Sequence, residues 1–142
     1  MALRILIPVD GSPCALNAVR HALSLAAEGC SVELTLLNVQ LPLSTGHVRQ
    51  FVARETLDEH YREAGDATLR EAVALAEGAG QGCVTHIAVG HIAATIAGYA
   101  AELGSDLIVM GSHGRRGITH ALLGSVAQEV LGATPKPVTI VK

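Results

Sequence analysis

Five short apolar runs divide the sequence and predict five β-strands. Each run is bounded by Gly, Pro, Ser or Asp, which is typical of buried strands between turns. The first run, L-R-I-L-I-P-V, and the fourth, D-L-I-V-M, have the strongest strand signal. The five predicted strands cover residues 3–9, 32–39, 83–89, 106–110 and 135–141.

Hydrophobic residues recur at helical spacing between these runs, which predicts four helices. Ser12 followed by Pro13 suits the cap and first residue of the first helix. Gly65 falls in the middle of the second and costs about 1 kcal/mol relative to Ala. The predicted helices cover residues 13–29, 49–78, 92–103 and 122–131.

Strands that alternate with helices predict a parallel sheet with helices on both faces, the doubly wound α/β class. Ligands of such sheets bind beyond the carboxyl ends of the strands, where the strand order reverses. Two strand ends are followed by turn residues: Asp10-Gly11-Ser12 after the first strand, and 111–114 after the fourth. If these strands are neighbours, the two loops face each other.

The fourth strand is followed by the pattern G-x2-G-x9-G-S, on Gly111, Gly114, Gly124 and Ser125. A strand that turns on glycines and leads into a helix start is suited to binding phosphate, because unpaired amides and the helix dipole favour an anion there. Neither G-x-x-x-x-G-K-[ST] nor G-x-G-x-x-G after the first strand occurs. The alternative is that these glycines serve only turns and helix packing.

Composition narrows the class of protein further. The chain has 142 residues, which fits one domain over 1–142, and its core must be aliphatic because 49% of residues are hydrophobic and 2% aromatic. A net charge of −3 gives no basic field for nucleic acid. No apolar run is long enough to span a membrane, no signal peptide is expected, and three widely spaced cysteines indicate reduced, buried thiols in the cytoplasm.

Four blocks of sequence resemble the universal stress protein family, in its nucleotide-binding subgroup: I-L-I-P-V-D-G-S, D-L-I-V-M-G-S-H-G, L-L-G-S-V and P-V-T-I-V-K. The resemblance implies a five-stranded sheet of order 3-2-1-4-5, an adenine nucleotide alpha hydrolase-like fold. It also implies a homodimer formed through the last strand. That strand, with Val138 and Ile140, is apolar on both faces, so at a sheet edge it would need a partner.

The resemblance also implies which residues contact the nucleotide. Positions at three strand ends would surround adenine and ribose: Pro8, Val9, Asp10, Val39 and Met110. Positions of the glycine motif and the following helix would hold the phosphates: Gly111, His113, Gly114, Arg115, Gly124, Ser125 and Val126. Mg²⁺ would lie between the phosphates. Relatives often carry Ser or Thr where this chain has Ala127.

The function predicted first is an ATP-binding stress-response switch with slow or no hydrolysis and no catalytic residue. Binding would order the loop after the fourth strand for a protein partner. One alternative is a nucleotide-free dimeric scaffold, and another is a weak ATPase that uses Asp10 or His113. No metal site built by the protein is expected, because the seven histidines lack ligand spacing.

Overall fold

Strands and helices alternate along the chain, which is described here from a computed structural model, and the described residues form nine such elements. The structure describes residues 1–43, 54–114 and 122–142. The strands are β1 (Leu3–Pro8), β2 (Val32–Gln40), β3 (Cys83–Val89), β4 (Leu107–Gly111) and β5 (Val138–Val141). The helices are α1 (Pro13–Ala27), α3 (Arg54–Gly78), α4 (Ile92–Glu102) and α5 (Ser125–Ala133).

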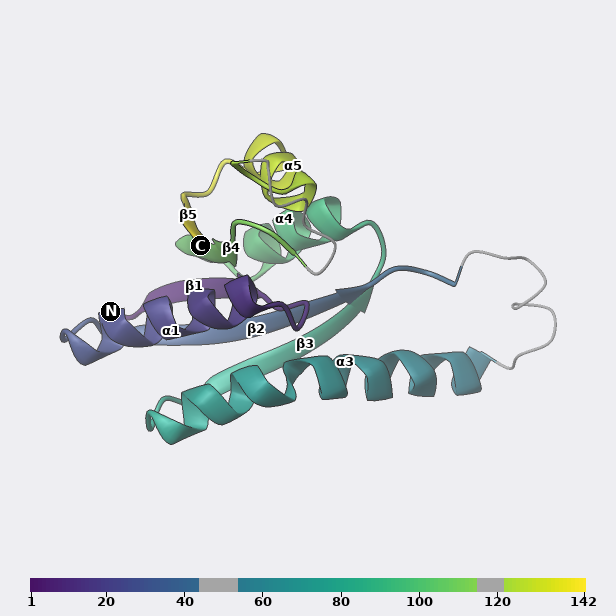
Figure 1. The fold of residues 1–142 in the computed structure, drawn as a ribbon, viewed down its shortest axis with the longest axis horizontal. Helices are drawn as coiled ribbons and strands as arrows, with labels where there is room; N and C mark the ends of the chain where they lie inside the picture. Colours follow the sequence, from purple (N-terminus) through teal and green to yellow (C-terminus); the bar gives the residue numbers. More distant parts are fainter. Residues whose placement is uncertain (44–53, 115–121) are drawn as a thin grey trace.

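All five strands form one parallel sheet of order β3-β2-β1-β4-β5 (Figure 1). The order reverses between β1 and β4, which are neighbours with Ile5 opposite Leu107 and Leu6 opposite Ile108. The predicted doubly wound sheet of order 3-2-1-4-5 is therefore confirmed. Because β1 and β4 are parallel, the loops that follow them both lie at the carboxyl ends of the strands.

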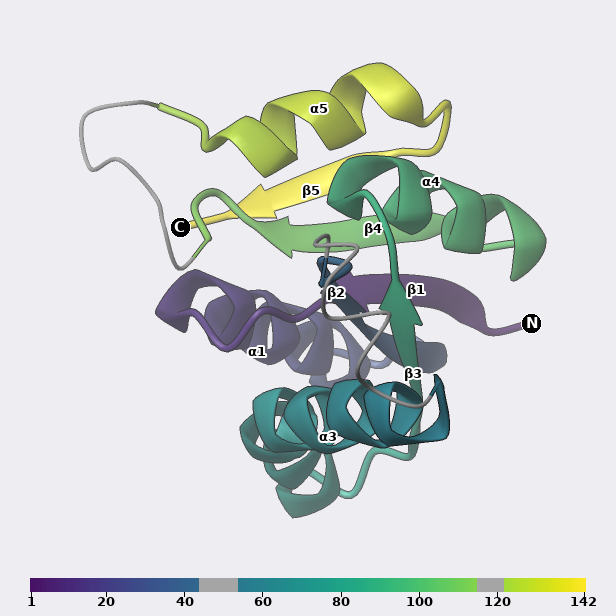
Figure 2. The same cartoon turned by 90° about the vertical axis from the view of Figure 1, so that its right-hand side faces the viewer.

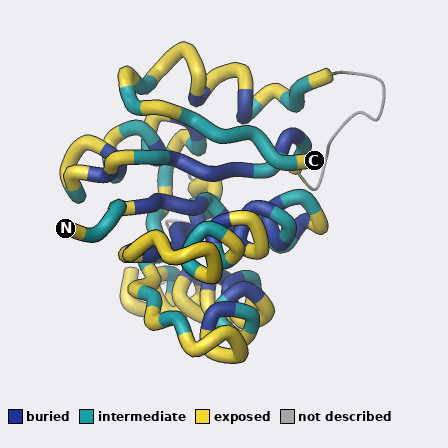
Figure 3. Tube along the Cα trace, turned by 90° about the vertical axis from the view of Figure 1, so that its left-hand side faces the viewer, coloured by how far each residue is buried: buried dark blue, intermediate teal, exposed yellow. Residues whose placement is uncertain are grey.

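Helices cover both faces of the sheet, and each face has its own apolar core. One core lies beneath α1 and α3 and includes Ile5, Val19 and Leu69. The other lies beneath α4 and α5 and includes Leu6 and Ile96. Figure 2 shows α4 and α5 beside β4 and β5, while α1 and α3 lie on the other side. Figure 3 shows the buried central strands between helices with exposed outer surfaces.

Several predicted boundaries shift in the structure, most of them by one or two residues. The helix expected from residue 122 begins at Ser125, because Gly124 has extended backbone and serves as its N-cap. The last strand begins at Val138 rather than at 135. The fourth ends at Gly111, one residue later than predicted. The predicted start of the long helix, 49–53, lies outside the described residues.

Gly65 has a packing role that its helix penalty did not reveal. An ideal Cβ at this position would lie 2.7 Å from three side-chain atoms of Ile87. Glycine therefore lets α3 approach β3 closely. It also shows that the Ile87 side chain, and by alternation those of Thr85 and Val89, lies on the α3 side of the sheet.

The cysteines only partly match the expectation of buried thiols. All three are free; Cys30 is exposed, whereas Cys14 and Cys83 are half-buried. Burial, with a smaller contribution from the Glu77 carboxylate, raises the pKa of the Cys83 thiol. Within the described ranges, none of the helices combines the length and apolarity that crossing a membrane requires.

Candidate functional site

The loop after β1 is held in place by its own hydrogen bonds. Asp10 Oδ1 accepts a hydrogen bond from the Ser12 amide at 2.9 Å, and Ser12 Oγ accepts one from the Ala15 amide at 3.2 Å. Gly11 has a φ of 82°, in the left-handed region that favours glycine. Ser12 is thus the N-cap of α1, as predicted, and the turn fixes the position of the Asp10 carboxylate.

A buried amide supports the same loop from below. Asn38, which is 3% exposed, donates from Nδ2 to the Val9 carbonyl at 2.8 Å, and Gln40 donates to its Oδ1. The Val9 amide donates to the Leu37 carbonyl at 2.8 Å. Asn38 was not among the predicted site residues, although a polar residue within an apolar run was the available signal.

The loops after β1 and β4 touch each other. An ideal Cβ on Gly114 would lie 2.6 Å from Asp10 Oδ2. An ideal Cβ on Gly111 would lie 2.7 Å from Cys14 Cβ and 2.9 Å from its carbonyl carbon, so Gly111 packs against the first turn of α1. The expectation that these loops face each other is therefore correct.

Ser112 connects three segments of this region and was also missed from the sequence. It is 3% exposed, and its amide donates to the Val141 carbonyl at 2.7 Å. Its carbonyl accepts a hydrogen bond from the Gly124 amide at 2.7 Å. Its hydroxyl lies 3.0 Å from Nδ1 of His113, at hydrogen-bond distance. Ser112 thereby links β4 to β5 and to the start of α5.

A Cβ at each of the three motif glycines would meet close neighbours, whereas their torsion angles are ordinary. The glycines of positive φ in the described chain are Gly11, Gly29, Gly80 and Gly104, so none belongs to the motif. An ideal Cβ on Gly124 would lie 3.1 Å from the Ser112 carbonyl oxygen. Packing is thus one reason for glycine at these positions, and it does not decide between the nucleotide site and the alternative interpretation.

The N-terminus of α5 points into the same region. Its N-cap, Gly124, has no side chain to bond the first-turn amides, and Ser125 at the first helical position is exposed. Val126 is half-buried, and Ala127 is 2% exposed within the core. The Gly124 amide itself is used by Ser112, so the amides left for an anion are those of the following residues.

The remaining predicted positions lie in different surroundings. Met110 is 5% exposed and packs with the core beneath α4 and α5, as does half-buried Val39. Pro8 is half-buried at the end of β1. His113 lies beside Ser112, and Arg115 falls outside the described residues.

The polar groups of this region can form hydrogen bonds with a ligand. The described side chains here contribute one carboxylate, Asp10, and the hydroxyls of Ser112 and Ser125. In the part of the chain that the structure describes, no group of three His, Cys, Asp or Glu residues is placed to hold a metal ion. A cavity of about 410 Å³ lies elsewhere, between α3 and β3.

A parallel sheet whose order reverses at the polar β1 and β4 loops defines the doubly wound class. The model of the universal stress protein family matches residues 1–142. Universal stress protein MJ0531 of Methanocaldococcus jannaschii is 33% identical over 139 residues, covering 98% of this chain and 81% of that protein. The chain belongs to the universal stress protein family, as its sequence motifs predicted.

Solved structures agree with this assignment. Protein MJ0577, also of Methanocaldococcus jannaschii, superposes with a TM-score of 0.85 at 30% identity, over 100% of this chain and 96% of that chain. A universal stress protein crystallised in complex with cAMP superposes with a TM-score of 0.70 at 31% identity, over 99% of this chain and 97% of that chain.

Proposed function

We propose that this protein binds ATP beyond the carboxyl ends of β1 and β4 and acts as a nucleotide-dependent regulatory switch. The observation that carries the proposal is the junction of Asp10, Gly114 and the start of α5 around one polar region. The family and the cAMP complex of a 31% identical relative support an adenine nucleotide as ligand. The cytoplasmic location expected from the sequence is part of this proposal.

The nucleotide would lie across the strand ends in an extended pose. Pro8, Val9 and Asp10 would line the ribose and adenine, with the Val39 backbone and Met110 on the other side of the base. The first-turn amides of α5 and the Ser125 hydroxyl would donate to phosphate oxygens, where the helix dipole favours negative charge. The residues at hand fit a phosphate because this N-terminus lacks a side-chain cap.

The remaining phosphate contacts would come from the loop that follows β4. Gly111, Gly114 and Val126 would contribute backbone, and His113 and Arg115 would contribute side chains. Mg²⁺ would be held chiefly by the phosphates themselves, since the described side chains of the region offer a single carboxylate, Asp10.

Slow or absent hydrolysis follows from the residues that the sequence lacks. No P-loop lysine is present to stabilise charge on the transferred phosphoryl group. We therefore propose that the loop after β4 tightens over bound ATP and that a protein partner reads this change. A weak ATPase remains the less favoured version.

A nucleotide-free scaffold is the second candidate, and one observation favours it. The Gly124 amide, which the motif offers to phosphate, already donates to the Ser112 carbonyl at 2.7 Å. The three motif glycines also have packing reasons that involve no ligand. On this alternative, the motif stabilises the junction of β4, β5 and α5.

Isothermal titration with ATP, ADP, AMP and cAMP, each with Mg²⁺, separates the two candidates. Binding of ATP more tightly than AMP or cAMP is the expected result. Absence of heat with every adenine nucleotide, together with no nucleotide absorbance near 260 nm in the purified protein, would favour the scaffold. Steady phosphate release that depends on Asp10 would instead favour the ATPase.

Variants at two exposed positions test the proposed pose, with thermal melting to show that each variant is folded. Ser125→Ala should weaken ATP binding roughly threefold to tenfold, because one hydrogen bond contributes about 0.5–1.5 kcal/mol. Gly114→Val combined with Ser125→Leu should abolish binding. Gly132→Ala is the matched control, because a Cβ there meets nothing within 4 Å. Unchanged affinity in the double variant would contradict the pose.

The homodimer through β5 is a further part of the proposal. The Pro137 carbonyl accepts a hydrogen bond from Ile108 of β4, and the Val141 carbonyl accepts one from Ser112, which follows β4. By alternation, the backbone groups of Val138 and Ile140 point away from the sheet. A second copy of β5 could pair there. Their side chains are half-buried against the core beneath α5.

Sedimentation velocity tests this interface. Wild type should sediment as a dimer, and Ile140→Asp should give monomer or aggregate, with thermal melting to show whether the fold survives. Val84→Asp, on the opposite edge of the sheet, should leave the dimer intact. A folded, dimeric Ile140→Asp protein would remove this interface.

A further inference from the structure

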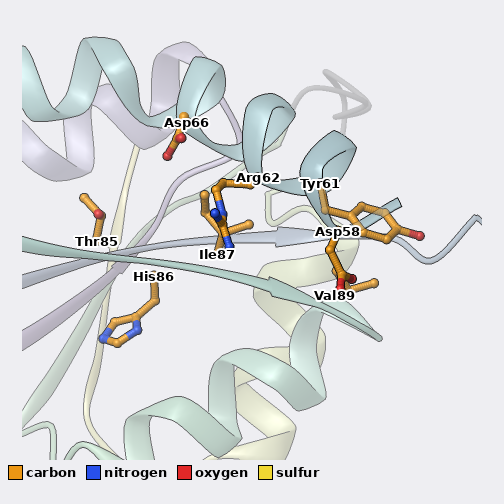
Figure 4. Close-up of a pocket in the computed structure, with 8 residues that line it drawn as sticks. All are labelled: Asp58, Tyr61, Arg62, Asp66, Thr85, His86, Ile87 and Val89. Carbon is orange, nitrogen blue, oxygen red and sulfur yellow. The ribbon is translucent and has the colours of Figure 1, made fainter. Parts of the chain in front are cut away.

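A cavity between α3 and β3 has no part in the proposed nucleotide site. Its volume is about 410 Å³, and residues of the two elements line it from opposite sides (Figure 4). The residues that matter below are three of α3 and three of β3: Asp58, Arg62, Asp66, Thr85, Ile87 and Val89. We call this region the α3–β3 groove.

One wall of the groove is the outer edge of the sheet. β3 is the terminal strand, paired only with β2 in the sheet of the described residues. The Gly90 amide donates to the Gln40 carbonyl of β2 at 2.9 Å. Because backbone groups alternate in direction along a strand, those of Thr85, Ile87 and Val89 point away from β2, toward the groove.

The two faces of β3 are distinct. Ile87 lies against Gly65 of α3, so the residues that point their backbone outward also turn their side chains toward the groove. His86 turns the other way, and its ring centroid lies 5.5 Å from that of Tyr99 on α4. Figure 4 likewise shows the His86 ring directed away from α3. Val84, on the same face as His86, is 57% exposed.

The other wall carries a row of charges. Asp58, Arg62 and Asp66 are spaced four residues apart on one face of α3, and all three are exposed. Ion pairs at this spacing are common, but none of these three side chains forms one with a described residue. The ion pairs among the described residues are Arg4–Glu33 and His91–Glu129. The row therefore presents negative, positive and negative charge without an internal partner in the described chain.

The spacing of this row matches that of an extended peptide. Four helical residues advance about 6 Å along the axis. Alternate residues of a strand, whose side chains share one face, are roughly 6.6–6.8 Å apart. A strand added to β3 would thus place every second side chain beside one charge of the row.

We propose that the α3–β3 groove binds an extended segment of a partner protein by strand addition to β3. The segment carries basic, acidic and basic side chains at three alternate positions, opposite Asp58, Arg62 and Asp66. Its main chain pairs with the outward backbone groups of β3. Its intervening side chains are apolar, because they join the face that exposes Val84.

The charge row argues against a second copy of this chain as the occupant. β3 reads C-V-T-H-I-A-V and contains no Asp, Glu, Lys or Arg. Another copy of β3 paired at this edge would therefore bring no charged side chain to the row. A partner segment with the complementary charge pattern would form hydrogen bonds with the outward backbone groups of β3 and ion pairs with the charges of α3.

The test compares two peptides of equal length whose charges have opposite sign at each of the three charged positions. Fluorescein-labelled Val-Lys-Val-Glu-Val-Lys-Val is the probe, and Val-Glu-Val-Lys-Val-Glu-Val is its matched control. In fluorescence polarisation at low salt, the probe should bind at least roughly tenfold more tightly, because three exposed pairs change sign together. Equal affinity, or no binding by the probe up to about 1 mM, would overturn the proposal.

A charge-reversed protein sharpens the result. The triple variant Asp58→Lys, Arg62→Glu, Asp66→Lys should invert the peptide preference. Glu63→Lys changes the net charge by the same amount at an exposed α3 position outside the groove lining, and should preserve the preference. A triple variant that keeps the wild-type preference would assign binding to another surface.

Hydrogen exchange then locates the bound peptide. The amides of Thr85, Ile87 and Val89 should exchange more slowly with the probe present, while nucleotide binding, tested separately, is unaffected. Protection elsewhere but not at β3 would contradict strand addition. A dimer of the wild type that dissociates on Val84→Lys would show that a second copy occupies this edge, and would also overturn the proposal.

Discussion

The strand-end region at β1 and β4 and the α3–β3 groove differ in how their polar and charged groups are paired. In the first, polar groups bond to one another: Asp10 to the Ser12 amide, and the Ser112 carbonyl to the Gly124 amide. In the second, exposed charges lie beside an open sheet edge and form no ion pair with one another or with other described residues.

This difference separates residues that the fold requires from residues that it leaves free. Close approach to backbone atoms constrains Gly111 and Gly124, so their replacement should cost stability whether or not a nucleotide binds. The charges of the groove contribute little to the fold, because exposed groups without partners stabilise neither state strongly. Substitutions in the strand-end region should therefore lower stability, whereas substitutions of the groove charges should change peptide binding and leave stability nearly unchanged.

The largest effect is expected at Gly111. Gly111→Ala would place Cβ 2.7–2.9 Å from Cys14 backbone and side-chain atoms at the start of α1, which must then shift. We expect a loss of about 1–3 kcal/mol in the free energy of unfolding, measured by urea denaturation. Gly98→Ala on α4 is the control, because nothing lies within 4 Å and the helix should gain up to about 1 kcal/mol. Equal effects at the two sites would contradict the packing argument.

Asn38 should come next, as the buried support of the β1 loop. Asn38→Ala leaves the Val9 carbonyl without its side-chain donor and should cost about 1–3 kcal/mol in urea denaturation. If nucleotide binds at Asp10, affinity should fall as well. Asn17→Ala, whose amide donates to the Lys142 carbonyl at the surface, should change stability by less than about 0.5 kcal/mol.

Gly65 tests the close approach of α3 to β3 beside the groove. Gly65→Ala forces Ile87 to move, but gains helix propensity, so a net loss of roughly 1 kcal/mol is expected. The neighbour here is a side chain, so Ile87→Ala should relieve the clash. In a double-mutant cycle by thermal denaturation, Gly65→Ala should become stabilising on that background. A destabilising effect that is the same on both backgrounds would contradict this contact.

The smallest effect on stability is expected from the groove charges. Asp58→Asn and Asp66→Asn should each change the free energy of unfolding by less than about 0.5 kcal/mol, because neither carboxylate has an ion-pair partner in the described structure. Thermal melting at low and high salt measures this. A loss comparable to that at Gly111 would mean that the charges serve the fold, and the comparison of the two regions would fail.

Sequence patterns predicted the fold well because each strand is a separate apolar run between turn residues. The third strand was predicted at its observed bounds, 83–89, and the cap of α1 at Ser12 was also correct. The predicted starts of the last helix and the last strand were less accurate. Gly124 is an extended N-cap that follows an apolar pair, so periodicity placed the helix start too early.

The candidate site was only partly predictable, since its supports act through tertiary contacts. Ser112 and Asn38 matter because of hydrogen bonds to residues of other elements, and no local pattern encodes those partners. Gly65 was interpreted as a helix penalty for the same reason. The α3–β3 groove was missed because its row of charges has meaning only beside the open edge of β3.

The hydrogen bond between the Ser112 carbonyl and the Gly124 amide has an evolutionary consequence. It joins the two ends of an eleven-residue stretch, so that the exit from β4 and the entry to α5 meet at 2.7 Å. Ends that are fastened together tolerate changes in the length between them, since doubling such a stretch adds only about 0.6 kcal/mol of closure entropy. The α/β framework itself would therefore tolerate a longer, shorter or rewritten stretch, so the spacing G-x9-G-S would be a requirement of the proposed nucleotide site rather than of the fold.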